Sequence, residues 1–317
     1  MSRALIVGHT GQDGTYLSRF LTEKGYTVMG MSSAGLVEDS AGAAVPCSVE
    51  AYDDVSSLIE SRRPSEVYYL AAVHQSSADA RTPDGSLFQR SLDINVKALV
   101  HFLESIRLHS SGTRLFYAAS SHIFGDPLCE PQNEDTPLNP VCIYGVSKTA
   151  GVQACRYYRE VHGVFASVGV FYNHESPLRN ARYVSQKIVR AAIGIKLGLE
   201  SELVLGSLDS RIDWGYAPDY VDAAWRLLQL SQPGDYVISS GDTHTVKEFV
   251  AGVFDYVGLD WQRYVKLNPA LITKKPKERL RGDIRKITGA TGWVPATSFN
   301  QLIRLLAEAE MVRRGIR

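Results

Sequence analysis

A glycine-rich segment close to the N-terminus constrains the fold more than any other feature of the chain. The segment Gly8-His9-Thr10-Gly11-Gln12-Asp13-Gly14 follows the short apolar run Arg3–Val7 and precedes residues with helical apolar spacing. Glycines at this spacing allow a tight turn, close approach of backbone N–H groups to a diphosphate, and close packing of helix on strand. The helix N-terminus adds partial positive charge for the phosphates. We therefore predict a dinucleotide site built from Gly8, Thr10, Gly11, Gln12, Asp13 and Gly14.

Short apolar segments alternate with amphipathic segments through the first half of the chain. Strands this short and apolar are typical of a buried parallel sheet rather than an antiparallel meander. The alternation predicts an α/β fold with a Rossmann-type, doubly wound parallel sheet. We expect strands at Arg3–Val7, Thr27–Met31, Glu66–Leu70, Leu115–Ala119 and Ala166–Phe171, and helices at Leu92–Leu108 and Ile143–His162.

The pattern of elements becomes mixed near Asn173. Residues Asn268–Lys286 are basic, contain proline and show no clear period. We divide the chain into a cofactor-binding Rossmann domain, residues 1–172, and a smaller α/β substrate-binding lobe, residues 173–317, from which some segments return to the first domain. In the second part we expect helices at Val184–Leu197, Asp219–Leu230, Val246–Val257 and from Phe299, and strands at Leu203–Leu205 and Val237-Ile238.

The charge balance argues against a nucleic-acid partner, and the lengths of the apolar stretches argue against a membrane-spanning segment. The 317 residues include 34 Lys plus Arg and 34 Asp plus Glu, so the formal net charge is zero. Nucleic-acid-binding proteins usually carry a basic excess, and therefore we expect no nucleic-acid partner. No stretch of about 18 apolar residues is present, which argues against a membrane-spanning segment.

The cysteines and the N-terminus indicate the compartment. Cys47, Cys129, Cys142 and Cys155 do not form a C-x-x-C pair, and no paired-histidine motif lies near them. This spacing argues against a zinc site, and we expect reduced structural thiols. The chain starts a strand almost at once, without the basic and apolar regions of a signal peptide. We therefore expect a cytoplasmic protein.

The end of the second predicted strand bears on the choice between NAD and NADP. An acidic side chain about 20 residues after the glycines would bind the adenosine 2′-hydroxyl of NAD. The strand ends instead in Gly30-Met31-Ser32-Ser33, so Ser32 and Ser33 are the polar residues at that position. Neither an acid nor an arginine stands there. The cofactor is NAD or NADP on this evidence, with NADP slightly favoured.

A second motif places a phenol beside an ammonium group. Tyr144 and Lys148 are spaced i, i+4 in the predicted helix Ile143–His162, so they lie on one face of it. The lysine charge would lower the tyrosine pKa and make the phenol a usable base. Ser120 and Ser121 end the fourth predicted strand, at the edge where such folds bind ligands. We predict a catalytic group of Ser120, Ser121, Tyr144 and Lys148.

Several longer phrases make the chain resemble a known family. It is similar to extended short-chain dehydrogenases/reductases, and among them it most resembles the GDP-mannose 4,6-dehydratase family. The match runs nearly end to end, and G-Q-D-G-x-Y-L and N-H-E-S-P are specific to that branch. The resemblance rests on G-H-T-G-Q-D-G-T-Y-L (8–17), Y-Y-L-A-A (68–72), Y-G-V-S-K (144–148), F-Y-N-H-E-S-P (171–177), D-W-G (213–215) and G-W-V-P (292–295).

The resemblance implies a nucleotide-sugar enzyme that uses a nicotinamide cofactor catalytically. Tyr144 would deprotonate the sugar 4-hydroxyl while hydride passes from C4 to the cofactor. The resulting 4-ketone would acidify the C5 proton, so that water can leave from C6. Hydride would then return from the cofactor to C6. Lys148 would assist Tyr144 and hold the nicotinamide ribose, and Ser120 would occupy the position of the family's catalytic threonine.

The family also implies a homodimer or homotetramer. The apolar helix Leu92–Leu108 would suit either an interface or packing on the sheet. Further residues placed at the cofactor are Leu70, Ala71 and Ala72, and residues placed at the substrate are Asn173, His174, Glu175 and Lys187.

The chain departs from the family at positions that bear on function. The family has a glutamate, the base for C5 and acid for C6, where this chain has His122. The family's R-D-W-G reads Ile212-Asp213-Trp214-Gly215, with Arg211 adjacent, and its R-P-x-E reads Lys275-Pro276-Lys277-Glu278. Arginine is a bidentate fork where lysine is a point charge, so that exchange is not neutral. We place Arg211, Lys275 and Glu278 at the substrate.

His122 leaves two functions open. An imidazole with an ordinary pKa near 6.5 could make both proton transfers of a dehydratase. It could equally mark the loss of dehydration, which would leave an NAD(P)H-dependent 4-keto-6-deoxy-sugar reductase or epimerase/reductase. A cofactor-binding protein without turnover is a third reading, and the presence of Ser120, Tyr144 and Lys148 argues against it. The family-specific phrases favour the dehydratase.

Overall fold

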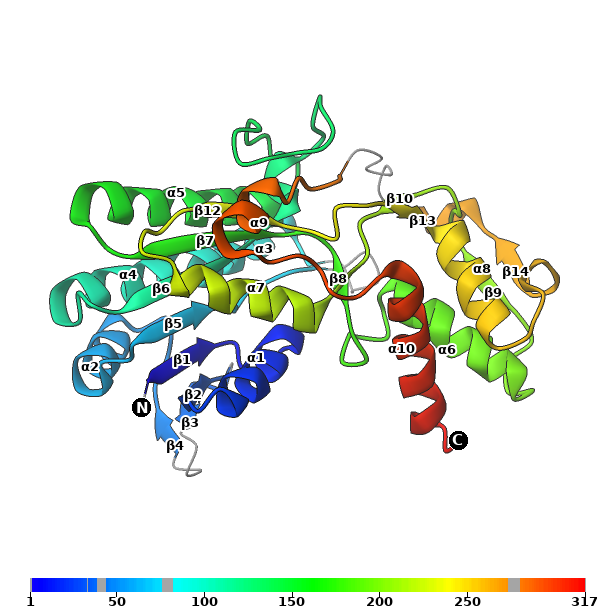
Figure 1. Cartoon of the computed structure of the whole chain (residues 1–317), viewed down its shortest axis with the longest axis horizontal. Coiled ribbons are helices and arrows are strands. Elements are labelled where there is room, and N and C mark those ends of the chain that lie inside the picture. Colours follow the sequence, from blue (N-terminus) through cyan, green and yellow to red (C-terminus); the bar gives the residue numbers. More distant parts are fainter. Residues whose placement is uncertain (1, 33, 39–43, 76–81, 273–279, 317) are drawn as a thin grey trace.

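An eight-stranded sheet forms the larger part of the computed structural model, which describes residues 2–32, 34–38, 44–75, 82–272 and 280–316. The six parallel strands lie in the order β12-β7-β6-β5-β1-β2, and the hairpin β3–β4 continues the sheet in antiparallel fashion beyond β2 (Figure 1). This confirms the predicted doubly wound sheet. The strands are β1 (Arg3–Val7), β2 (Thr27–Met31), β3 (Leu36–Glu38), β4 (Ala44–Pro46), β5 (Glu66–Tyr69), β6 (Arg114–Ser120), β7 (Ala166–Phe171) and β12 (Asp235–Ile238).

Two layers of helices cover the sheet because successive residues of each strand point to opposite faces. In β1, Leu5 and Val7 join the core under one layer, while Ala4 and Ile6 join the core under the other. The first layer contains α2 (Tyr52–Arg62), α3 (Asp84–Leu92), α4 (Ala98–His109) and α5 (Ile143–His162). The second contains α1 (Gln12–Glu23), α7 (Ala217–Gln229) and α9 (Arg285–Thr291).

One predicted helix is longer than expected and contains an irregular turn. The segment expected as Leu92–Leu108 begins at Asp84 as α3, passes through a π-helical turn at Asp93–Lys97 (η1) and continues as α4. Periodicity did not reveal α3 because its side chains are mostly exposed. The apolar face of α4 is buried in the core beneath the sheet, so packing on the sheet accounts for its hydrophobicity.

A second lobe stands beyond the carboxyl ends of the strands, at the right of Figure 1. Its core is formed by three helices around the stacked rings of Trp214 and Phe249, 4.5 Å apart. The helices are α6 (Val184–Lys196), α8 (Val246–Tyr256) and α10 (Phe299–Arg313). The short strands near or in this lobe are β8 (His174–Glu175), β9 (Leu203–Leu205), β10 (Arg211–Ile212), β11 (Gly215–Tyr216), β13 (His244–Thr245) and β14 (Val265–Leu267).

Local sequence signals explain where several helices begin and end. The helices α8 and α10 each start with a capping box, Thr245 with Glu248 and Ser298 with Gln301. Helix α5 ends where Gly163 adopts a φ of 67°. Three further single turns are helical: η2 (Ser121–Phe124), η3 (Trp261–Arg263) and η4 (Pro269–Leu271).

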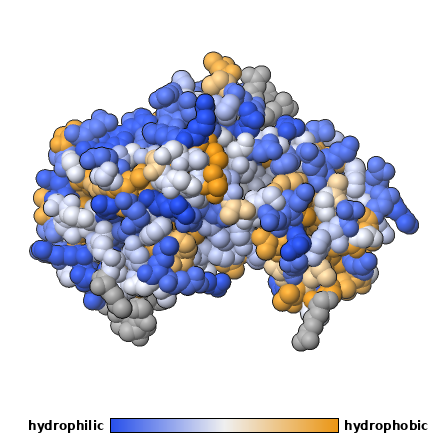
Figure 2. Space-filling model, viewed as in Figure 1, coloured by the Kyte–Doolittle hydropathy of each residue, from blue (hydrophilic) through white to orange (hydrophobic). Residues whose placement is uncertain are grey.

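The surface is mostly hydrophilic on the face shown in Figure 2, and its outline is indented between the two lobes. Among the helices of the described residues, none is both long enough and apolar enough to cross a membrane. The chain after β7 crosses between the lobes several times, since β12 belongs to the sheet and α7 and α9 pack on it, while α6, α8 and α10 form the second core.

Candidate active site

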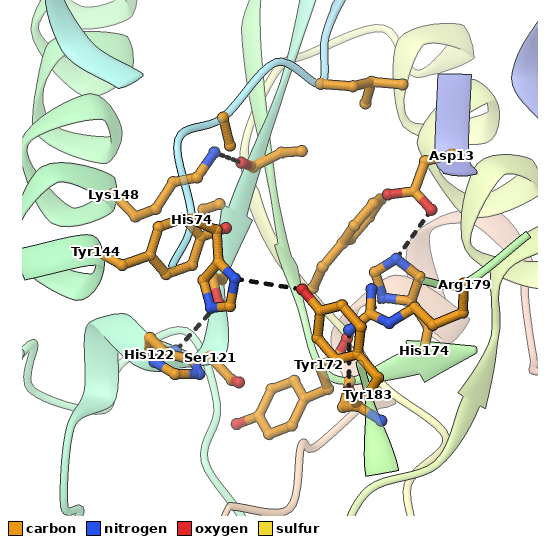
Figure 3. Close-up of a pocket in the computed structure, with 17 residues that line it drawn as sticks. Asp13, His74, Ser121, His122, Tyr144, Lys148, Tyr172, His174, Arg179 and Tyr183 are labelled. Carbon is orange, nitrogen blue, oxygen red and sulfur yellow. Dashed lines mark hydrogen bonds and ion pairs between the residues drawn. The ribbon is translucent and has the colours of Figure 1, made fainter. Parts of the chain in front are cut away.

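A cavity of about 230 Å³ lies where the carboxyl ends of the strands meet the second lobe (Figure 3). Its walls come from the segments after β5 and β6, from α5, from the end of β7 through β8, and from the loop before α6. Ligands in doubly wound folds bind at this edge because the loops diverge there. The cavity therefore lies where the sequence placed the site.

The glycine loop forms the wall of a second cavity of about 340 Å³, which Gly8, Thr10, Gly11 and Ser32 help to line. Gly8 has a φ of 92°, and a Cβ there would lie 2.8 Å from the backbone nitrogen of Ala71. Only a residue without a side chain fits this turn. The predicted residues Leu70 and Ala72 line both cavities, so the two are neighbours. Ser33 lies outside the described residues.

Gly14 brings the first helix against the turn. A Cβ at Gly14 would lie 2.3 Å from the carbonyl oxygen of Gly8 and 2.5 Å from Cα of His9. Both contacts are with backbone atoms, which cannot rotate away. The N-terminus of α1 consequently lies directly behind the loop, in the position that favours an anion.

The end of β6 presents two serines and a histidine. Ser120 and Ser121 are both buried and line the 230 Å³ cavity with His122. The Ser120 hydroxyl accepts a hydrogen bond from the His122 backbone N–H at 3.3 Å, and it also hydrogen-bonds the Tyr144 phenol. The His122 ring lies 3.5 Å, Nδ1 to Sγ, from Cys142 at the start of α5. Ser120, His122 and Tyr144 are thereby brought together.

Lys148 is fully buried and lies one helical turn after Tyr144 on α5. Its Nζ donates a 2.7 Å hydrogen bond to the carbonyl oxygen of Ala118 and lies 5.7 Å from the Tyr144 ring centroid. Burial lowers the pKa of Lys148 to about 7, because the desolvated ammonium is disfavoured. The group thus titrates close to neutrality.

The environment of Tyr144 differs from the sequence expectation. Burial raises the pKa of Tyr144, and Tyr183 and Asp13 raise it further, while Arg179 and the hydrogen bond from Ser120 act in the opposite direction. The i, i+4 spacing predicted a lowered pKa, but burial outweighs the effects that lower it, and the Lys148 ammonium donates to the Ala118 carbonyl oxygen. In this structure the phenol is therefore held in its protonated form.

Two family-specific phrases meet on the opposite side of the cavity. Asp13 of the glycine loop lies 3.0 Å from Nε2 of His174, and the other ring nitrogen of His174 lies 2.8 Å from the Tyr172 carbonyl oxygen. The Gln12 side chain accepts a hydrogen bond from Ser176 at 2.8 Å. Both ring nitrogens of His174 are thus engaged within the protein.

The charges of Asp13 and His174 support each other. Burial alone would raise the pKa of Asp13, but the charge and hydrogen bond of His174 outweigh it, and the pKa falls below its usual value. Burial alone would lower the pKa of His174, but Asp13 outweighs it, and the pKa rises. The pair is therefore a carboxylate and an imidazolium, each stabilising the other's charged form.

Glu175 lies behind the cavity wall and holds two residues that line it. Its carboxylate accepts hydrogen bonds from Asn173 at 3.0 Å and from Ser185 at 2.6 Å, and lies 3.6 Å from the Arg179 guanidinium. Glu175 is 1% exposed. It orients Asn173 and Arg179, which border the cavity, while its own oxygens face the protein.

Two other residues predicted at the substrate, Lys187 and Arg211, lie away from this cavity. Lys187 is exposed on α6 and donates to the Val204 carbonyl oxygen at 2.7 Å. Arg211 is exposed on β10 and donates to both the hydroxyl and the carbonyl oxygen of Thr243. Lys275 and Glu278 lie outside the described residues.

Sequence reasoning missed His74, Arg179 and Tyr183, which line the cavity together with the equally unpredicted Ala118, Ala119, Phe171 and Tyr172. His74 follows β5, and the motif reading stopped at Ala72 in the same loop. Arg179 and Tyr183 follow the N-H-E-S-P phrase closely, and the Arg179 guanidinium lies 3.7 Å from the Tyr183 ring centroid. The signal that could have found them was proximity in sequence to segments already assigned to the site.

The fold and site define a class. A glycine loop between β1 and α1, with a serine at a strand end and a Tyr-x-x-x-Lys pair on the following helix, is the arrangement of an extended short-chain dehydrogenase/reductase. Comparison with known proteins identifies the branch: residues 5–306 match the family model for GDP-mannose 4,6 dehydratase. The chain belongs to the GDP-mannose 4,6-dehydratase family.

One relative and two solved structures illustrate the match. GDP-mannose 4,6 dehydratase 1 of Arabidopsis thaliana is 35% identical over 97% of this chain and 89% of its own length. RMD from Pseudomonas aeruginosa, solved with NADPH, has a TM-score of 0.80 at 21% identity, covering 99% of this chain and 100% of its own. dTDP-glucose 4,6-dehydratase from Bacillus anthracis, solved with NAD, has a TM-score of 0.81 at 16% identity over 99% and 98%. These findings confirm the family, the fold and the nucleotide-sugar 4,6-dehydratase class predicted from the sequence.

Proposed function

We propose that this enzyme converts GDP-mannose to its 4-keto-6-deoxy derivative, with loss of one water and with NADP used catalytically. The observation that carries the proposal is the convergence of Tyr144, Ser120, Lys148 and His122 on one cavity beside the glycine loop. The first three residues serve removal of hydrogen at sugar C4. His122 supplies the group that elimination of water requires.

The residues present fit a nicotinamide dinucleotide. The backbone cradle at Gly8 and Gly14 leaves no space for side chains, and the two neighbouring cavities together run from Ser32 to Lys148. We propose that the diphosphate is held by the glycine loop, that is by Gly8, Thr10, Gly11, Gln12, Asp13 and Gly14. Asp13 would act through its contact with His174. Leu70–Ala72 would border the ribose. When bound, the nicotinamide supplies a hydride acceptor and donor for the sugar carbons.

In the first half of the reaction, Tyr144 receives the proton of the sugar 4-hydroxyl. Ser120 hydrogen-bonds the phenol and is placed to bind the same sugar oxygen, and Ser121 is buried beside it. Lys148, with a pKa of about 7, provides a donor at the base of the cavity without a permanently charged group. We infer that Lys148 positions Tyr144 and the cofactor ribose.

In the second half, His122 removes the C5 proton and protonates the departing C6 hydroxyl. The 4-ketone acidifies C5–H, so a base of ordinary strength suffices. An imidazole can accept and then donate a proton near neutral pH, as the glutamate of the family does. The contact with Cys142 orients the ring.

For the substrate we propose that residues 173–317 largely form the nucleotide-sugar-binding lobe, while residues 1–172 bind the cofactor. Asn173 and Arg179 offer an amide and a cation at the cavity, both held by Glu175. His174 contributes through its pair with Asp13. Farther out, we propose that the nucleotide contacts Lys187, Arg211, Lys275 and Glu278.

For the cofactor we propose NADP rather than NAD. Strand β2 ends near Ser32, which lacks the carboxylate that would bind a ribose 2′-hydroxyl. Arg90 also lines the 340 Å³ cavity, where its guanidinium lies 2.7 Å from Glu50. It supplies a cation for a 2′-phosphate, and Ser32, with Ser33 beside it in sequence, supplies hydroxyls.

We further propose a cytoplasmic homodimer or homotetramer. Val146, Tyr157 and Val161 lie on one face of α5 and are 36%, 54% and 59% exposed. An apolar helix face of this kind favours association with a second copy. Light scattering at several protein concentrations tests this assembly.

A mass spectrum of GDP-mannose incubated with the enzyme and catalytic NADP tests the proposed reaction. A product lighter by one water supports dehydration, and His122→Ala should abolish that loss while exposed His162→Ala should not. An unchanged mass favours the alternative raised by the imidazole at position 122, a ketoreductase. The alternative predicts a gain of two hydrogens by GDP-4-keto-6-deoxymannose in the presence of reduced cofactor.

A further inference from the structure

His74 occupies a central position that the reaction scheme above does not use. Its ring centroid lies 4.7 Å from that of Tyr144 and 6.2 Å from that of His122, with the rings close to perpendicular in both pairs. On the other side, Nδ1 of His74 lies 3.3 Å from the Tyr183 hydroxyl. Figure 3 shows His74 between Tyr144 and His122 on one side and Tyr183 on the other.

A buried asparagine fixes the loop that carries His74. The Asn95 side chain accepts a hydrogen bond from the Val73 backbone N–H at 2.8 Å and donates to the Val73 carbonyl oxygen at 3.3 Å. It also donates to Ser147 of α5 at 2.9 Å. Asn95 comes from the π-helical turn η1 and is fully buried. The loop is thereby tied to the helix that carries Tyr144.

The proton balance of the proposed reaction leaves one proton on Tyr144 and needs one at C5. Oxidation at C4 gives one proton to Tyr144. His122 then takes the C5 proton and gives one to the departing hydroxyl, so it is back in its starting form when water leaves. C6 later gains a hydride, and C5 must gain a proton that His122 no longer holds, while Tyr144 holds one in excess.

We propose that His74 is a proton relay that carries this proton from Tyr144 to His122 in each turnover. The inference rests on the proposed roles of those two residues. The Tyr144 phenol loses its proton to the His74 imidazole as it receives that of O4. The resulting imidazolium protonates His122, which delivers the proton to C5. Every proton is thus accounted for, and the overall change is loss of one water.

Two features of the site support this direction of transfer. Burial keeps the Tyr144 pKa high, so the phenol can accept the O4 proton only as it passes its own proton on. The Tyr183 hydroxyl contacts the Nδ1 edge of His74, which positions the ring relative to its neighbours. Other titratable groups of the described residues near this cluster are Lys148, Asp13 and Arg179 around Tyr144, Cys142 beside His122, and Asp84, which lines an adjoining cavity.

The adjoining cavity gives the experiment a route for rescue. It measures about 350 Å³, and His74, His122 and Tyr144 all contribute to its wall. A small proton carrier such as free imidazole can therefore approach the cluster where a side chain has been removed. Rescue of this kind distinguishes a relay from a residue that serves only packing.

The decisive experiment follows a single turnover of GDP-mannose on the NADP-loaded enzyme in three forms: wild type, His74→Phe and His74→Ala. Because Tyr144 can take the O4 proton only while it passes its own proton on, we expect hydride removal to slow about 100-fold in both variants. Little reduced cofactor should form in the first turnover, and quenched samples should contain unreacted GDP-mannose. Free imidazole should restore turnover of His74→Ala.

His162→Phe is the matched control, since it removes an exposed histidine at the end of α5 and leaves His74 in place; it should remove hydride at the wild-type rate. Hydride removal at the wild-type rate in both His74 variants would overturn the relay. Where His74→Phe folds poorly, the imidazole response of His74→Ala decides, and failure of rescue contradicts the proposal. A wild-type enzyme that releases no water refutes the proposed function itself, independently of the variants.

Discussion

The carboxylate of Asp13 and the imidazole of His174 lie 3.0 Å apart, although 161 residues separate them in the chain. The contact joins the glycine loop of the sheet to the segment that leads into the second lobe. The side chain of His174 is 10% exposed and that of Asp13 is 22% exposed. The pair therefore couples the cofactor side of the cavity to the substrate side through a largely buried charge contact.

Replacing Asp13 with Asn should weaken both the fold and the cofactor site. We expect the free energy of unfolding to fall by about 2 kcal/mol. Breaking a fully buried ion pair costs about 3–5 kcal/mol, and the cost is smaller here because Asp13 is partly exposed. The His174 pKa should fall because its carboxylate partner is gone. Urea denaturation and a histidine NMR titration measure the two effects.

The pH dependence of this pair has a defined sign. The raised pKa of His174 contributes stability below its unfolded value of 6.5, and this is lost as pH rises through the folded pKa. The lowered pKa of Asp13 contributes stability above 3.8, which is lost as pH falls through the folded pKa. As a control, Asp242→Asn removes an exposed carboxylate 3.7 Å from His244 and should change little. Equal effects of the two substitutions would contradict the prediction.

Lys148→Met should stabilise the protein at pH 7 while removing activity. Burial of the ammonium is costly, but Met would leave the Ala118 carbonyl oxygen without its donor, a loss of about 1–2 kcal/mol. We expect a net gain of about 2 kcal/mol in the free energy of unfolding. Chemical denaturation and a turnover assay on the same preparation measure both consequences.

The sign of the pH effect provides a second check on Lys148. Between its folded pKa of about 7 and its unfolded value of 10.5, the unfolded state binds the additional proton. The free energy of unfolding of the wild type should therefore rise with pH over this window relative to Lys148→Met. Parallel stability curves for the two proteins would show that the ammonium is not desolvated as described.

Gly14→Ala should destabilise the protein strongly, because its Cβ would meet backbone atoms of Gly8 and His9 that cannot move independently. We expect a loss of about 3 kcal/mol together with weaker cofactor binding. The matched control is Gly289→Ala in α9, where a Cβ meets nothing within 4 Å, and which should gain about 0.5–1 kcal/mol from helix propensity. Thermal denaturation of both variants measures the difference, and a mild effect at Gly14 would contradict the close packing.

Ser32→Asp should shift cofactor preference from NADP toward NAD. A carboxylate at the end of β2 would accept hydrogen bonds from ribose hydroxyls and repel a 2′-phosphate. We expect the ratio of dissociation constants for NADPH and NADH to change by at least about tenfold, or roughly 1.4 kcal/mol. Fluorescence titration measures both constants. Ser57→Asp on the exposed face of α2 adds the same charge elsewhere, and an equal shift there would show a nonspecific effect.

The sequence predicted the central sheet and much of the site because the relevant signals are local. Helix α5 and strand β7 have the predicted bounds, Ile143–His162 and Ala166–Phe171. Periodicity, glycine spacing and the i, i+4 relation of Tyr144 and Lys148 depend on neighbouring residues alone. Helix α3 was missed because it is only nine residues long and its side chains are mostly exposed.

Tertiary structure alone decided which groups face one another. Nothing in the spacing of Asp13 and His174 indicates their contact, and the position of His74 depends on the Asn95 clamp from a distant π-helical turn. The protonation of Tyr144 was likewise misjudged, because the direction of the Lys148 ammonium and the depth of burial arise only when the strands and helices pack. A linear sequence specifies which charges and rings are present, whereas desolvation and distance, which set their chemistry, belong to the folded chain.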